Sequence, residues 1–119
     1  MHDLIINERL GYILESIDLI EERFKKIKSA AIFNSSKEGL ETMDSIAMRL
    51  QHIAENIKKI NHLQPEFFEN QILLDPNPII GFRDFISHHY EKTDADIIFD
   101  ICVSDISVLK EKISSFLKK

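Results

Sequence analysis

Arg83, His88 and Tyr90 bring three side chains that can act on a phosphate into one short stretch, RDFISHHY. Arginine grips phosphate oxygens through two parallel N–H groups, and histidine exchanges a proton near neutral pH. A phenol donates a hydrogen bond to an oxyanion or is itself modified. The stretch therefore predicts phosphate chemistry, with Arg83 and His88 as the catalytic pair.

The spacing of these residues constrains how they can meet. At about 100° per residue, Arg83 and Tyr90 point the same way two turns apart, while His88 lies roughly 140° around the helix from Arg83. One straight helix would therefore separate the imidazole from the guanidinium. Either the helix unwinds near His88, or a second copy of the chain supplies the missing group across a two-fold axis.

Simpler roles compete for each residue. An arginine on a helix is most often a solvated charge. His88 lies four residues after Asp84 and could pair with that carboxylate, and Tyr90 could end a helix with its hydroxyl in water. His89 shares a helical stripe with Phe82, which favours a packed core histidine over a catalytic one.

Apolar residues recur at three- and four-residue spacing along two long stretches, which predicts two helices that pack antiparallel. The first covers about residues 3–29. The second follows a capping box formed by Ser35 and Glu38 and carries an apolar stripe that starts at Leu40. Pro65 is expected to open a short helical turn through EFFEN.

Two further helices are expected after this turn. Asn77 followed by Pro78 suits a helix cap and a first helical position, so the motif helix should start there. Thr93, with Asp96 three residues on, should cap a final amphipathic helix. The predicted fold is all-α, an up-and-down bundle of four main helices plus a short helical segment, in one domain over all 119 residues.

The charge balance limits the partners. With 20 acidic and 15 basic residues the net charge is -5, which argues against broad binding of nucleic acid, because that affinity needs many lysines and arginines. Any RNA must be held locally. No run of about 18 apolar residues or signal peptide is present, so a cytoplasmic protein without a membrane partner is expected. The basic clusters, expected to be solvated faces, are Lys25, Lys26 and Lys28, Lys58 and Lys59, and Lys118 and Lys119.

Neither a metal nor another cofactor is expected. Cys102 is the one cysteine in the chain, so it has no thiol partner for a metal site, and it is predicted to be a small core residue. Di-metal sites in bundles need repeated Glu and Glu-x-x-His elements on facing helices. The sequence offers only a reversed pair, His52-x-x-Glu55, for which a surface pair is favoured.

The stretch PIIGFRDFISHHY resembles the signature of the HEPN superfamily, and within it that of the HepT-like ribonuclease toxins: a glycine, a hydrophobic residue, Arg, four residues, His, any residue and Tyr. The next segment, DADIIFDICVSDISVL, is similar to the family's following helix, with Phe99 where tryptophan is frequent. In the second helix, IAEN resembles the family's Ile-Gly-Glu-Ala. Glu55 matches this pattern, while Ala54 and Asn56 depart from it.

The resemblance implies a HEPN-like bundle that acts as a metal-independent endoribonuclease toxin on RNA. Arg83 would hold the phosphate, His88 would move the proton, and Tyr90 would be either catalytic or the acceptor of AMP from a minimal nucleotidyltransferase antitoxin. The residues expected to support this site are Glu55, Asp84 and Ser87. Glu55 could equally be an ordinary surface glutamate.

The resemblance also implies a homodimer whose paired motifs line a shared cleft. It therefore favours a second copy of the chain, rather than an unwound helix, as the source of the missing group. An alternative function stays open, a non-catalytic helical subunit that helps a nucleotidyltransferase to bind its substrate. The net negative charge fits this alternative, and the complete Arg, His and Tyr pattern fits the enzyme.

Overall fold

A computed structural model describes residues 2–82 and 92–118; residues 1, 83–91 and 119 lie outside the described part. The described residues form helices joined by turns and loops, without a strand among them, which confirms the all-α class. Their order is α1 (His2–Phe24), α2 (Ala31–Ser35), α3 (Lys37–Leu63), the π-helix η1 (Phe68–Ile72), α4 (Asn77–Ile80), α6 (Lys92–Asp100), the π-helix η2 (Ile101–Asp105) and α7 (Ile106–Leu117).

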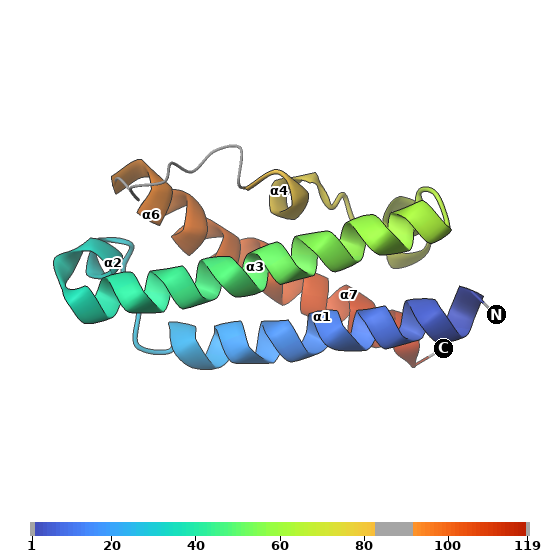
Figure 1. Cartoon of the computed structure of the whole chain (residues 1–119), viewed down its shortest axis with the longest axis horizontal. Helices are drawn as coiled ribbons and strands as arrows, with labels where there is room; N and C mark the ends of the chain where they lie inside the picture. The colour runs from blue at the N-terminus through green and yellow to red at the C-terminus, as the bar shows by residue number, and fades with distance from the viewer. Residues whose placement is uncertain (1, 83–91, 119) are drawn as a thin grey trace.

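The helices form a bundle around α3 (Figure 1). α1 lies alongside α3 and runs antiparallel to it, as the sequence predicted. The continuous stretch of α6, η2 and α7 crosses this pair and contacts both helices, and α4 packs on α3. Both ends of the chain lie at the same end of the bundle (Figure 1). None of the described helices is long and apolar enough to span a membrane.

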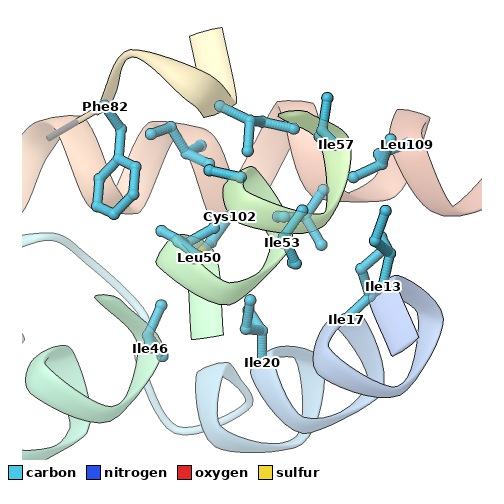
Figure 2. Packing of buried hydrophobic residues seen from close by; sticks show 14 of the residues in the cluster. Ile13, Ile17, Ile20, Ile46, Leu50, Ile53, Ile57, Phe82, Cys102 and Leu109 are labelled. Atoms are coloured by element: carbon cyan, nitrogen blue, oxygen red, sulfur yellow. The ribbon is translucent and has the colours of Figure 1, made fainter. Parts of the chain in front are cut away.

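Isoleucine dominates the core. Ile13 and Ile17 of α1 face Leu50 and Ile53 of α3, and all four side chains are fully buried (Figure 2). Burying a side chain of this size stabilises a fold by about 1.5–3 kcal/mol relative to leaving it in water. Phe82, the residue before the motif segment, belongs to the same cluster and is 1% exposed.

The start of α3 corrects the predicted capping box by one residue. Ser36, not Ser35, caps the helix, and its Oγ accepts a hydrogen bond from the Gly39 amide at 3.0 Å. Ser35 instead ends α2, a short helix that the sequence did not predict, and its hydroxyl donates to the Ile32 carbonyl at 2.9 Å. The shift leaves Leu40 exposed and buries Gly39 against α2.

The end of the first helix also differs from the prediction. α1 ends at Phe24 rather than near residue 29, and the Phe24 carbonyl accepts from the Ile27 amide at 2.9 Å in a turn. Ile27 is still buried, so the apolar spacing continues without helical backbone. The helical turn expected after Pro65 is present as η1.

The predicted caps of the two later helices are wrong. Asn77 lies inside α4, whose N-cap is Pro76, and the Asn77 amide donates to Asp75 Oδ1 at 3.0 Å. α6 begins at Lys92, so Thr93 is a helical residue rather than the cap. The motif helix was expected to continue from this start, but α4 ends at Ile80 with Gly81 as its C-cap, and the segment from Arg83 to residue 91 lies outside the described residues.

The last helix was predicted as one regular helix, but η2 interrupts it. A π-helical turn holds one residue more than an α-helical turn and so rotates the face that follows. Ile98 before η2 and Ile106 and Leu109 after it are all buried. The π turn therefore keeps both halves of the stretch in register with the core.

Two glycines give opposite predictions for stability. A Cβ on Gly39 would overlap the Ile32 carbonyl oxygen and lie 3.1 Å from that of Phe33, and backbone atoms cannot move aside cheaply. Gly39→Ala should therefore lower the free energy of unfolding in urea by about 1–3 kcal/mol.

Gly11→Ala is the matched control, because a Cβ there meets no atom within 4 Å and Gly11 lies inside α1. Its unfolding free energy should rise by up to about 1 kcal/mol, the difference in helix propensity. Equal stability of the two variants would show that the α2–α3 contact is not tight.

Candidate functional site

The predicted catalytic segment lies outside the described residues. This applies to Arg83, Asp84, Ser87, His88, His89 and Tyr90, so their mutual geometry stays a prediction. The structure does fix the elements that flank them. Phe82 on one side is buried beside Leu50 and Cys102 (Figure 2), and Ala95 on the other side is buried in the first turns of α6.

Asp94 is a polar residue near the motif that the sequence analysis missed. It lies in the first turn of α6, four residues after Tyr90, and is only 4% exposed. An aspartate at this position is stabilised by the positive end of the helix dipole. A carboxylate that follows the motif closely in sequence is therefore held on the main body of the bundle. The sequence signal that could have identified Asp94 was its position directly after Thr93, the predicted helix cap.

A second acidic feature comes from the π turn. Asp100 precedes η2 and Asp105 ends it, so one π-helical turn separates the two carboxylates. Partial burial and the negative charge of Asp100 raise the pKa of Asp105 above its usual value. η2 contacts α4, the element that leads to the motif segment.

Glu55 is exposed on α3, and its Oε1 accepts a hydrogen bond from Gln51 Nε2 at 3.1 Å. Its predicted role in supporting the motif depends on residues outside the described part and stays a prediction. His52 is exposed as well. In the described part of the chain, no three His, Cys, Asp or Glu side chains are grouped so that they could hold a metal ion.

Asn56 has a structural role that the sequence did not indicate. Its side chain is 3% exposed, its Nδ2 donates to the His52 carbonyl at 3.0 Å, and its Oδ1 accepts from Arg9 Nη1 at 3.1 Å. The contact joins residues 47 positions apart, so no local sequence pattern could reveal it. Asn56 thus orients an arginine on α1.

Cys102 is a core residue, as predicted. Its side chain is buried, and burial raises the pKa of the thiol to about 12. The thiol is therefore protonated at neutral pH, and only thiolates are good nucleophiles. Cys102 is excluded as the reactive group of this chain.

Comparison with known proteins gives a family match. The sequence profile of the family described as "Ribonuclease HepT-like" matches residues 13–116, a range that includes the whole motif segment.

A protein of Methanocaldococcus jannaschii described as "Gamma-glutamylcyclotransferase and putative RNase" is 32% identical to this chain over 110 residues. The alignment covers 92% of this chain and 46% of that protein, so the chain spans about half the length of the curated relative that it matches. No solved structure matches the chain.

Proposed function

This chain belongs to the HepT-like ribonuclease family, and we propose that it is a metal-independent endoribonuclease that acts as the toxin of a toxin–antitoxin pair. The observation that carries the proposal is the family match across the segment in which Arg83, His88 and Tyr90 keep the Arg-x4-His-x-Tyr spacing. The RNase description of the archaeal relative supports it.

The proposed chemistry uses a nucleophile that RNA itself carries. The 2′-hydroxyl lies beside each phosphate, and His88 accepts its proton as the oxygen attacks phosphorus. The bond to the 5′-oxygen breaks, and that oxygen takes up a proton from water as it leaves, while the proton that His88 accepted returns to water, so the step balances. The products are a 2′,3′-cyclic phosphate and a 5′-hydroxyl end.

Arg83 stabilises the charge that develops on the phosphate oxygens during this step. Its planar guanidinium donates two parallel hydrogen bonds, which a lysine cannot do. Tyr90 adds a hydrogen bond or orients the imidazole. Buried Phe82 supports this assignment, because it fixes the backbone immediately before Arg83.

The proposed active unit is a homodimer. Since Arg83 and His88 point roughly 140° apart on a straight helix, a guanidinium and an imidazole that act on one phosphate come most simply from two chains. The paired motifs then line one cleft at the two-fold axis.

The proposed regulation acts on Tyr90. A nucleotidyltransferase antitoxin transfers AMP from ATP to the Tyr90 oxygen and releases pyrophosphate. The attached phosphate places negative charge and bulk where an RNA phosphate must bind, so cleavage stops.

The His88→Ala variant should lose RNA cleavage by about a hundredfold or more while it keeps its circular dichroism and melting temperature. The measurement is the rate at which purified protein cleaves labelled RNA. The control is His52→Ala, since His52 is exposed on α3, and this variant should cleave at the wild-type rate. If His88→Ala cleaves undiminished, the catalytic assignment is wrong. If the wild-type protein does not cleave RNA but binds a nucleotidyltransferase, the non-catalytic subunit is favoured.

Mixing inactive variants tests the dimer. If Arg83 and His88 act across the two-fold axis, an equal mixture of Arg83→Ala and His88→Ala chains forms heterodimers in half the cases, each with one intact site of two. About a quarter of the wild-type activity should then return after subunit exchange. Two inactive proteins whose mixture is also inactive, with exchange shown by mass spectrometry, would place both groups in one chain.

Co-expression with the cognate nucleotidyltransferase should increase the intact mass by whole AMP units and abolish RNA cleavage. Tyr90→Phe should abolish the mass increase, because it removes the accepting oxygen. Tyr12→Phe is the matched control, since Tyr12 is the other tyrosine of the chain and is 40% exposed on α1. Modification that persists in Tyr90→Phe and disappears in Tyr12→Phe would move the acceptor site to α1.

A further inference from the structure

A basic pocket lies where the first half of α1 meets the last turns of α3. Its volume is about 460 Å³, and we call it the α1–α3 pocket. The residues that line it are Ile5, Arg9, Lys58, Lys59, His62 and Leu63. Three permanent cations and a histidine thus surround two aliphatic side chains, without a carboxylate in the lining, in a chain whose net charge is -5.

Arg9 is held in place by a neutral partner. Asn56 is fixed by its hydrogen bond to the His52 carbonyl, and its Oδ1 accepts from Arg9 Nη1. A carboxylate in this position would orient the guanidinium and also neutralise it. An amide orients it and leaves its full positive charge and its remaining N–H groups for another anion.

Within the described residues, no side-chain ion pair joins Lys58 or Lys59 to a carboxylate. Both ion pairs recorded between described side chains involve Lys110 on α7, which bonds Glu21 and Asp18 of α1. Glu55, one turn before Lys58 and Lys59, accepts from Gln51 instead. His62 lies in the last turn of α3, where the negative end of the helix dipole favours a basic side chain. Lys58 and Lys59 lie before that turn, so the dipole does not explain their position.

We propose that the α1–α3 pocket binds a backbone phosphate of the RNA substrate, away from the bond that is cut. The identity of the ligand as RNA rests on the proposed function. Arg9 and the two lysines contact the phosphate, and Ile5, 50% exposed, packs with Leu63 against the attached nucleoside. The pocket supplies the local attraction that an acidic protein needs to hold a polyanion.

The position of the pocket implies that RNA length matters. α3 has 27 residues and is roughly 40 Å long, and the pocket lies at its C-terminal end. α6, which directly follows the motif segment, contacts α2 near the other end of α3 (Figure 1). A dinucleotide has a single bridging phosphate, the one that is cut, so it cannot also fill the pocket, whereas a longer strand offers a second phosphate for it.

The test measures RNA affinity in His88→Ala protein, in which the RNA stays whole. Fluorescence anisotropy of a labelled single-stranded RNA is recorded at several salt concentrations. Lys58→Ala/Lys59→Ala should reduce the slope of log affinity against log salt by up to about 0.7, the contribution of the one single-strand phosphate that the pocket holds. A tenfold rise in salt then costs the parent protein up to about fivefold more affinity than it costs the variant.

Lys25→Ala/Lys28→Ala is the matched control. It removes the same two charges from exposed positions that do not line the pocket, and the slope should not change. An equal effect of the two double variants overturns the pocket assignment, because attraction would then depend on net charge alone. Parent protein that does not bind RNA overturns it as well.

Two further measurements separate this proposal from the proposed function. With His88 intact, Lys58→Ala/Lys59→Ala should slow cleavage of long RNA and leave dinucleotide cleavage unchanged. If wild-type protein does not cleave RNA but the pocket variant alone loses affinity, the catalytic function is wrong and the pocket assignment stands. If AMP or inorganic phosphate binds the parent as tightly as RNA and only the pocket variant loses it, the ligand is a free anion, which overturns the assignment to RNA.

Discussion

The packing of the isoleucine-rich faces of α1 and α3 against the last helical stretch is the constraint on which the rest of the molecule depends. This core buries Phe82, and so it fixes the chain just before the motif (Figure 2). It also holds the start of α6, just after the motif, where Asp94 and Ala95 are buried. The described part of the protein thereby supports the short segment with the proposed catalytic residues at both of its ends.

Hydrophobic periodicity predicted the fold class and most of the core, because a helix that packs on one side must repeat its apolar residues at that period. Met43 to Ile60 on α3 follow this rule closely. The predicted N-cap of α3, Ser35, was wrong by one residue. The fit of Gly39 against α2 decides which serine caps the start of this helix. Local sequence does not contain that tertiary contact.

The site could be predicted in part. The spacing of Arg83, His88 and Tyr90 predicts the chemistry, and the family match covers this stretch, but the three residues lie outside the described part, so their roles stay a prediction. The hydrogen bond between Arg9 and Asn56 could not be predicted, because it joins residues far apart in the sequence on two helices. Asn56, which departs from the family pattern, thus has a structural role. The π turn that brings Asp105 near Asp100 was equally hidden, since only packing of the last helix requires it.

Analysis of the RNA ends tests the central claim most directly, that His88 and Arg83 use the 2′-hydroxyl of RNA without a metal ion. Purified protein would be incubated with RNA in excess EDTA, and the products examined by mass spectrometry. The account predicts cleavage at an unchanged rate, with 2′,3′-cyclic phosphate and 5′-hydroxyl ends, and no cleavage where a 2′-deoxynucleotide precedes the scissile phosphate. Cleavage that EDTA stops, or that leaves 5′-phosphate ends, would contradict it.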